Sequence, residues 1–134
     1  MWSHYANKHK GFCLEFHSGL HNSTFNPIDV DYKKTFLKAS YKKDGIEALT
    51  HLLYTKSVDW SYEEELRDVK IDLEDRKVQY RKEELKAIYL GVNCEPEYKV
   101  KIIDVLNKKY RGKVEIYQSV MIDNTFAVRW EKLN

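Results

Sequence analysis

Residues 85–92, with the sequence LKAIYLGV, are the stretch from which the fold can be worked out. A short, nearly continuous apolar run that stops at a glycine is typical of a strand buried in a sheet. Glu95, Pro96 and Glu97 follow, and a proline with acidic neighbours in the first turn indicates the start of a helix. Gly112 is a natural end for this helix. Its predicted core face comprises Val100, Ile103, Leu106 and Tyr110.

Patterns on both sides of this stretch complete the predicted order of elements. Residues 45–56 carry leucines at helical spacing after a capping-box pattern, which predicts a second helix. Most of the other segments alternate between apolar and polar residues, which predicts strands. The order β-β-α-β-β-β-α-β-β predicts an α+β fold with a mainly antiparallel sheet and two main helices. The predicted strands comprise residues 12–16, 28–32, 62–73, 77–80, 85–91, 114–122 and 126–130.

Length and composition predict one domain over residues 1–134, because a chain of this size with 43% apolar residues can bury a single core. The 23 Lys and Arg residues nearly balance the 21 Asp and Glu residues, so no global field directs the chain to DNA or to an anionic membrane. The sequence has two cysteines, no apolar signal segment and no run long enough to span a bilayer. We therefore expect a cytoplasmic protein without a membrane partner.

Two stretches combine large aromatic residues with ionisable ones: MWSHYANKHKGFCLEF, residues 1–16, and KSVDWSYEEELR, residues 56–67. If a strand begins near Tyr62, one of its faces carries Glu63, Glu65 and Arg67. On that face the guanidinium can donate to a carboxylate. Such an arrangement is either a structural ion pair or a fork for an anionic ligand, and the sequence favours the structural interpretation. Because partly buried ionisable groups need partners, we expect the two stretches to meet in space.

The same two stretches resemble the bacterial domain of unknown function 2971 family. Residues 1–16 are similar to its motif W-S-H-Y-A-x-x-H-x-G, after which comes a strand that ends in Phe. Residues 56–67 are similar to its motif K-x-x-x-W-x-Y-E-x-E-x-R. LKAIYLGVN resembles the family's strand-glycine-helix element, so the similarity covers nearly the whole chain. The resemblance implies no activity, because the family has none assigned. The positions that match its two motifs are Trp2, His4, Tyr5, His9, Gly11, Lys56, Trp60, Tyr62, Glu63, Glu65 and Arg67.

The resemblance also predicts a truncation at the N-terminus. Members usually carry a segment with an Asn-Asp-Pro element before the W-S-H-Y motif, whereas this chain starts at that motif. Loss of such a segment would expose apolar surface or a sheet edge, which favours self-association. We therefore expect a homo-oligomer, most simply a two-fold dimer. The strands expected at its interface lie in residues 12–16 and 126–130.

The first function hypothesis is an enzyme-like domain that acts on a nucleotide or a nucleic acid, with ADP-ribosyl transfer as an analogy at the level of the fold. Its candidate catalytic residues are His4, Tyr5 and Glu65. The second hypothesis is a non-catalytic, oligomeric interaction module in which both stretches serve packing. A shared, solvent-reachable cleft for His4 and Glu65 would favour the first hypothesis. The candidate ligand-binding residues are Trp2, Lys56, Trp60, Tyr62, Glu63 and Arg67.

Other polar segments give weaker signals. The spacing of Cys13, His17 and His21 matches no standard zinc pattern, so no metal site is expected, and no cofactor can be named. A basic stretch interleaved with Phe36 and Tyr41 is either a loop that binds a nucleic-acid strand or a solvated loop, and the solvated loop is the commoner outcome. Its lysines are Lys33, Lys34, Lys38, Lys42 and Lys43.

Overall fold

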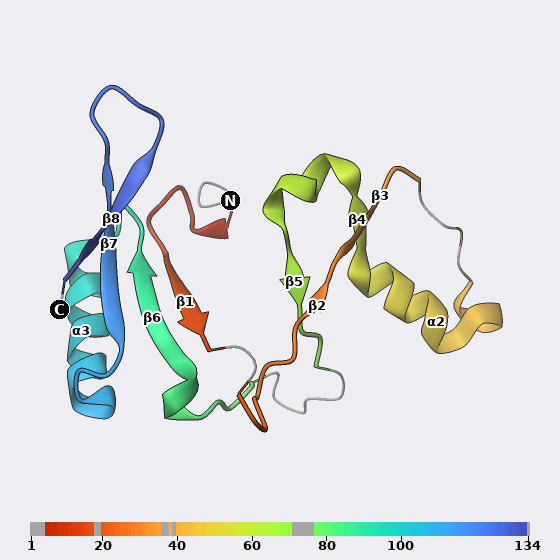
Figure 1. The fold of residues 1–134 in the computed structure, drawn as a ribbon, viewed down its shortest axis with the longest axis horizontal. Helices are drawn as coiled ribbons and strands as arrows, with labels where there is room; N and C mark the ends of the chain where they lie inside the picture. Colours follow the sequence, from red (N-terminus) through yellow and green to blue (C-terminus); the bar gives the residue numbers. More distant parts are fainter. Residues whose placement is uncertain (1–4, 18–19, 36–37, 39, 71–76, 134) are drawn as a thin grey trace. The chain divides into compact units, whose positions relative to one another are not determined.

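The computed structural model describes residues 5–17, 20–35, 38, 40–70 and 77–133. The chain divides into two compact units, and each is described by itself (Figure 1). Unit 1 combines residues 1–24 with residues 80–134, and unit 2 comprises residues 25–79. The expectation of a single domain stays a prediction.

Unit 1 is built on a four-stranded sheet in the order β1-β6-β7-β8. β6 (Leu85–Leu90) pairs antiparallel with β1 (Phe12–Phe16) and parallel with β7 (Glu115–Met121). β7 turns back into β8 (Val128–Lys132) as an antiparallel hairpin. The inner position of β6 explains its apolar sequence, because a strand with a neighbour on each side loses most of its contact with water, and Leu90 is fully buried.

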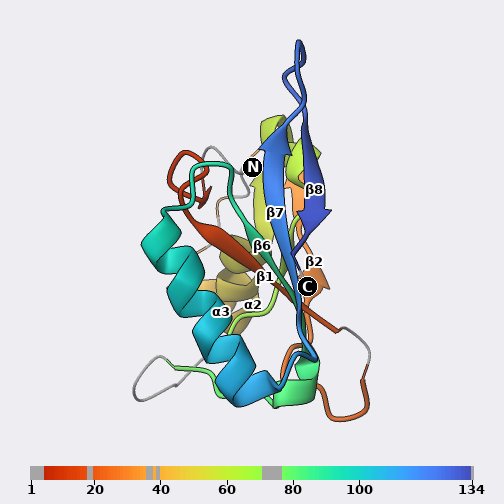
Figure 2. The same cartoon turned by 90° about the vertical axis from the view of Figure 1, so that its left-hand side faces the viewer.

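The helix α3 (Pro96–Tyr110) connects β6 to β7 and lies along one face of this sheet (Figure 2). Proline in its first turn has no N–H to leave unsatisfied, and the helix ends where Arg111 and Gly112 take φ values of 52° and 72°. The prediction that Val100 faces the core is wrong, since this side chain is 65% exposed. The buried core cluster that joins helix and sheet consists of Leu85, Ile88, Leu90, Leu106, Val114 and Ile116.

Unit 2 contains two small sheets of two strands each. β2 (Ile28–Asp29) pairs antiparallel with β5 (Leu66–Arg67), and β3 (Asp31–Lys33) pairs parallel with β4 (Thr55–Ser57). Val30, between β2 and β3, is buried. The strand predicted over residues 28–32 is therefore two short strands that pair with different partners.

Two helices connect the strands of unit 2. The helix α2 (Tyr41–Tyr54) leads into β4, and the 3-10 helix η1 (Val58–Glu63) follows β4. Gly45 has a φ of 54° and a ψ of −125°, so α2 is interrupted there, whereas the sequence predicted that a helix would start at this residue. A glycine adopts such a conformation without the steric cost that a side chain would add.

The predicted α+β class, the mainly antiparallel main sheet and the two main helices are confirmed. The long strand predicted over residues 62–73 is wrong in the part that the structure describes. Glu64 takes left-handed φ and ψ values of 46° and 49° after η1, which interrupts an extended chain, and only Leu66–Arg67 forms a strand. Residues 77–80 are not a strand either, and residues 71–73 lie outside the described residues.

Candidate functional site

The stretch KSVDWSYEEELR brings four ionisable side chains of unit 2 together. Lys56 lies on β4, Glu63 ends η1, Glu65 precedes β5 and Arg67 lies on β5. The left-handed conformation of Glu64 turns the chain between η1 and β5, and Glu63 and Glu65 on either side of it both bind Lys56. The sequence predicted Glu63, Glu65 and Arg67 on one face of a strand, whereas the structure groups them, together with Lys56, around a turn.

Glu65 is held by two cations. Arg67 Nε donates to Glu65 Oε1 at 2.6 Å, and Arg67 Nη2 donates to Oε2 at 2.9 Å, which is the forked geometry of a paired, charge-assisted contact. Lys56 Nζ donates to the same Oε2 at 3.0 Å and also to the carboxylate of Glu63. Arg67 Nη1 donates to the carbonyl oxygen of Leu53 at 2.5 Å, which ties the guanidinium to the last turn of α2.

These contacts fix the charge of the site at neutral pH. The hydrogen bonds from Arg67, followed by that from Lys56, lower the pKa of Glu65 to about 2. An ionised carboxylate with this pKa is a poor proton donor and a weak base, so general acid–base catalysis does not suit it. It can supply a fixed negative charge or hold two cations in position. Glu63, with 3% of its side chain exposed, is ion-paired to Lys56, as a buried carboxylate requires.

Two aromatic rings stand beside this cluster. The ring of Trp60 lies 5.2 Å from Lys56 Nζ, in a cation–π arrangement. The rings of Trp60 and Tyr62 are 6.0 Å apart with planes inclined at 35°. Trp60 is 39% exposed and Tyr62 60% exposed, so both present surface to a ligand as well as to the protein.

A small basic cavity of about 80 Å³ adjoins the cluster through Lys56. β3 and β4 run parallel, and the cavity is lined by the residues around their ends. Lys33 forms an ion pair with Asp31 at 2.7 Å, whereas no ion pair of Lys34 is found in the described part of the chain. The residues lining the cavity are Lys33, Lys34, Thr35, Thr55, Lys56 and Ser57.

The predicted site residues of the N-terminal stretch cannot all be located. Trp2 and His4 lie outside the described residues. Tyr5 is described in unit 1 and is 67% exposed, whereas Glu65 belongs to unit 2. The expected meeting of the two stretches in space therefore stays a prediction.

The rest of the N-terminal stretch has a clear structural role within unit 1. The N–H of Gly91, at the end of β6, donates to the carbonyl oxygen of Gly11 at 3.0 Å, and the N–H of Asn93 donates to that of His9 at 2.9 Å. The Asn93 side chain donates to the carbonyl oxygen of Lys8 at 3.1 Å. A Cβ on Gly91 would lie 2.1 Å from the His9 oxygen, so this close approach requires glycine.

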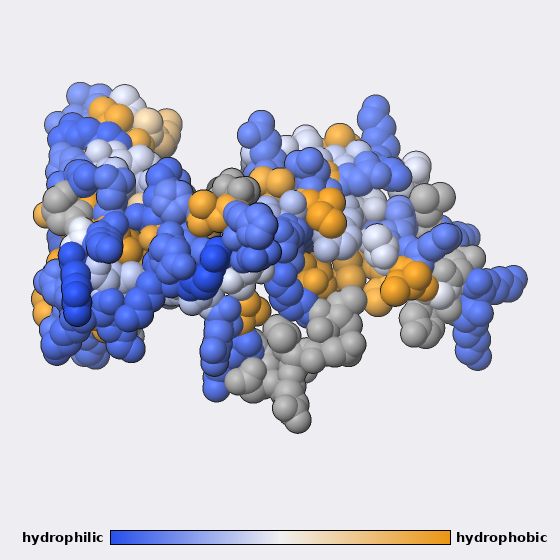
Figure 3. Space-filling view, turned by 60° about the horizontal axis from the view of Figure 1, so that its bottom comes forward, coloured by the Kyte–Doolittle hydropathy of each residue, from blue (hydrophilic) through white to orange (hydrophobic). Residues whose placement is uncertain are grey.

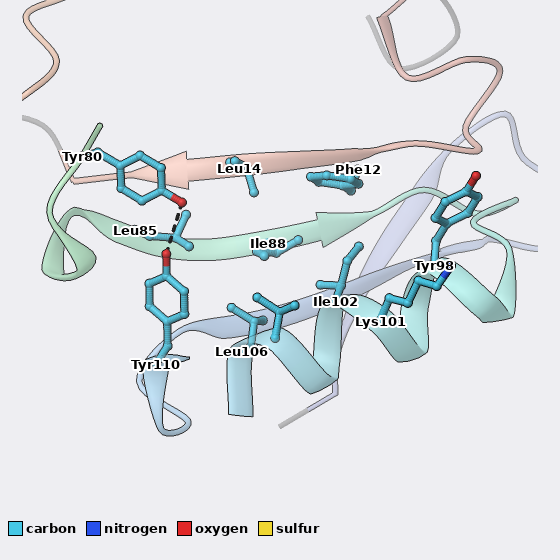
Figure 4. Close-up of a pocket in the computed structure, with 11 residues that line it drawn as sticks. Phe12, Leu14, Tyr80, Leu85, Ile88, Tyr98, Lys101, Ile102, Leu106 and Tyr110 are labelled. Carbon is cyan, nitrogen blue, oxygen red and sulfur yellow. Dashed lines mark hydrogen bonds between the residues drawn. The ribbon is translucent and has the colours of Figure 1, made fainter. Parts of the chain in front are cut away.

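Sequence reasoning missed an apolar cavity of about 260 Å³ between β1, β6 and α3 (Figure 4). Tyr80 and Tyr110 close one end with their hydroxyls 3.2 Å apart. Phe12 and Leu14 border it from β1 and are 49% and 36% exposed. The alternation in residues 12–16 revealed this apolar face, but only the placement of α3 shows that the helix leaves part of it open.

Two kinds of feature are not found among residues 5–17, 20–35, 38, 40–70 and 77–133. No group of three or more His, Cys, Asp or Glu side chains is arranged to hold a metal ion. No helix combines the length and the apolar character that crossing a bilayer would need.

Comparison with known proteins gives one match. The sequence model of a family described as protein of unknown function (DUF2971) matches residues 1–67, half of the 134 residues. The match includes the whole Lys56–Arg67 cluster of unit 2. No curated protein and no solved structure matches the chain.

Proposed function

Because the chain belongs to the DUF2971 family of proteins of unknown function, we propose its function from its own site: unit 2 binds a nucleotide, either free or within a nucleic acid. The observation that carries the proposal is the lysine-lined cavity next to the exposed Trp60 and Tyr62. Lys56 belongs to both features, since it lines the cavity and lies over the Trp60 ring.

The cavity suits a phosphate group. Its volume of about 80 Å³ corresponds to two or three water molecules at roughly 30 Å³ each, which is too small for a whole nucleotide. Lysine binds phosphate as a point charge, and Lys33, Lys34 and Lys56 line this one cavity. The hydroxyls of Thr55 and Ser57 already bond to His51 and Asp59. Lys33 and Lys56 are also ion-paired, so Lys34 would supply most of the attraction.

The aromatic pair suits a base. Every nucleobase presents a flat π face, and stacking on an aromatic side chain contributes about 1–3 kcal/mol per base. Trp60 and Tyr62 both expose ring surface, and their planes are inclined to each other. The two rings can thus contact one base or two successive bases, which fits a free nucleotide and a strand alike.

Any catalytic role follows from the charge of Glu65. A carboxylate that stays ionised next to a bound sugar can stabilise positive charge that develops there, as an ADP-ribosyl transfer would demand. Glu65 is the residue that we propose for this role, because Arg67 and Lys56 keep it ionised and fixed. Proton transfer by His4 or Tyr5 stays a prediction of the sequence.

Binding is tested by calorimetric titration of the protein with ADP and with the oligonucleotide dT6. Trp60→Leu is expected to weaken binding about tenfold or more, because the stacking surface is lost. Lys34→Ala is expected to weaken it about fivefold, because one phosphate contact is lost. Lys42→Ala, which removes an exposed lysine of α2 outside the cavity, should bind as the unmodified protein does. Failure of both ligands to bind, or unchanged binding in Trp60→Leu and Lys34→Ala, contradicts the proposal.

A second candidate function, self-association, is favoured by the edge strand β1. β1 is one of the two edge strands of the sheet, and its exposed Phe12 and Leu14 border the apolar cavity. Edge strands with apolar side chains tend to pair with further strands. A second copy fits this edge, because β1 can pair antiparallel with its own two-fold mate. The net charge of +2 opposes such pairing only weakly.

The expected result for this second candidate is a species of twice 16.0 kDa in light scattering after size exclusion at micromolar concentration. Leu14→Arg should shift it to the monomer, because a charge would enter the apolar contact. Leu52→Arg, at an exposed position on α2, is the matched control and should leave the dimer intact. A protein of 16.0 kDa at every concentration would rule self-association out.

A further inference from the structure

Unit 1 contains a basic cavity of about 430 Å³ where α3 ends and β6 begins. Lys82, in the 3-10 turn η2 (Lys82–Glu84), lines it from one side. Lys109, Arg111 and Lys113 line it from the end of α3 and from the turn into β7. His17, which follows β1, lies at the same cavity. No part of the candidate site in unit 2 contributes to it.

The fold brings these cations together from distant parts of the sequence. Arg111 and Gly112 take left-handed conformations that end α3 and reverse the chain toward β7. η2 leads directly into β6, which pairs with β7, so Lys82 and Lys113 both precede neighbouring strands. Figure 3 turns this end of unit 1 toward the viewer, and hydrophilic surface dominates it.

The protein forms no ion pair with the four cations of the cavity in the described part of the chain, although Glu83 also lines it. These cations are Lys82, Lys109, Arg111 and Lys113. By contrast, two lysines on the same helix, Lys101 and Lys108, pair with Glu97 and Asp104 at 2.5 and 2.7 Å.

One acidic residue lines the cavity, and the wider charge distribution also favours an anion. Glu83 is that residue, and its carboxylate lies 3.8 Å from Arg81 Nε. Unit 1 holds 13 Lys and Arg residues against 9 Asp and Glu residues, so its formal net charge of +4 exceeds the +2 of the whole chain. The cavity lies in the unit that carries the excess of positive charge.

The simplest structural explanation accounts for only part of this cluster. Cations in the last turn of a helix stabilise its negative end, which explains Lys109. Lys82 and Lys113 lie outside α3, on η2 and on the turn into β7, so they are not last-turn residues of the helix. Glu83 offsets one of the four positive charges, and an anion that enters the cavity lowers the remaining repulsion.

We propose that this cavity binds successive phosphate groups of a single-stranded nucleic acid. A volume of about 430 Å³ exceeds the space that one phosphate needs, and four cations match several singly charged phosphodiesters. All four side chains are exposed, so a long ligand can pass along the opening. The inference rests on the proposed function for the class of ligand. It adds a second binding site, in unit 1, whose ligand is a strand of nucleic acid.

The test measures the salt dependence of binding by fluorescence anisotropy with a labelled dT12 strand. Each neutralised phosphate contributes about −0.7 to the slope of log K against log salt concentration for a single strand. The triple variant Lys109→Gln, Arg111→Gln, Lys113→Gln is therefore expected to flatten the slope by about 2 and to weaken binding. The double variant Lys101→Gln, Lys108→Gln removes lysines that are already paired and should keep the slope. Circular dichroism checks that both variants fold.

Two further titrations separate the outcomes. ADP binding to the triple variant should be unchanged, because the unit 2 site is intact. An unchanged slope in the triple variant overturns the inference, and continued ADP binding then leaves the proposed function standing. If inorganic tripolyphosphate binds through the same three residues and dT12 does not, the phosphate site stands and a free oligophosphate is its ligand. If neither anion binds, the site is refuted.

Discussion

Replacing Gly91 with Ala is expected to lower the free energy of unfolding by about 3 kcal/mol or more. The added Cβ would lie 2.1 Å from the carbonyl oxygen of His9 and 3.0 Å from that of Gly11. Both are backbone atoms, so the clash cannot be relieved by rotating a side chain. The N-terminal stretch would have to leave β6, and the hydrogen bonds from Gly91 and Asn93 would break. Urea unfolding followed by circular dichroism measures the loss.

The matched control is Gly112→Ala. Gly112 has a φ of 72° and open space around the position of a Cβ, so alanine would meet only the cost of the left-handed conformation, about 1 kcal/mol. Stability of Gly91→Ala equal to that of Gly112→Ala would mean that the N-terminal stretch does not dock on β6.

Substitution of Glu84 is expected to produce the second large loss. Glu84 is fully buried, and its carboxylate accepts from the Thr24 N–H at 2.6 Å, the Thr24 hydroxyl at 2.7 Å and the Arg81 N–H at 2.7 Å. Glu84→Gln would place an NH₂ group against at least one of these donors, and Glu84→Ala would leave all of them unsatisfied. Both variants should melt roughly 10 °C or more below the unmodified protein.

The stabilisation by Glu84 is expected to depend on pH in a definite direction. The hydrogen bonds from Thr24, followed by those from Arg81, lower the pKa of Glu84 to about 2 from an ordinary value of 4.5. The carboxylate therefore stabilises the fold fully above pH 4.5, and this contribution is lost as the pH falls from there toward 2. Between pH 5 and pH 2, the melting temperature should fall less steeply with decreasing pH for Glu84→Gln than for the unmodified protein. Glu65 titrates in the same range, so the slope is reduced without vanishing.

Glu83→Gln is the control for both measurements. Glu83 is the preceding residue, its side chain is 66% exposed, and it lies 3.8 Å from Arg81. Surface pairs of this kind contribute little to stability. If Glu84→Gln melts at the temperature of Glu83→Gln, the buried carboxylate does not hold Thr24 to the rest of unit 1.

Much of unit 1 could be predicted because its pattern is local. Residues 12–16 alternate, and β1 occupies the same residues. Residues 85–91 form a short apolar run that ends in glycine, and β6 covers Leu85–Leu90. A proline with acidic neighbours predicted the start of α3, which begins at Pro96. In each case the signal and the structure lie within the same few residues.

The structure of unit 2 was harder to predict, because the conformation of one residue interrupts a strand that the alternating pattern predicted. The alternation from Tyr62 onward suggested a strand, but the left-handed Glu64 ends η1 and leaves a strand of two residues. A glutamate gives no sequence signal for such a conformation, which glycine and asparagine adopt far more readily. The contact between the Arg67 guanidinium and a nearby carboxylate was nevertheless predicted from the sequence, although on a strand face and without Lys56.

The features that escaped sequence reasoning depend on long-range contacts. Glu84 looks like any acidic residue of a polar segment, and its partner Thr24 is 60 residues away. The cation cavity joins Lys82 to residues at the end of α3 only because β6 and β7 are neighbours. Periodicity reports which face of an element is apolar, and it does not report which distant segment meets that face.

The division of the chain has a consequence for biosynthesis. Unit 2 is inserted in the covalent chain of unit 1, so β1 is made long before its partner β6, and the hydrogen bond from Tyr89 to Glu15 joins residues 74 apart. On the ribosome, all of unit 2 emerges before this pairing can begin, and closing so long a loop costs entropy. During that interval β1 carries Phe12 and Leu14 without its neighbouring strand. The nascent N-terminal segment is thus exposed to aggregation in this interval. In a circular permutant that begins at residue 25, β1 would be synthesised after β6 and would meet its partner as soon as it emerged.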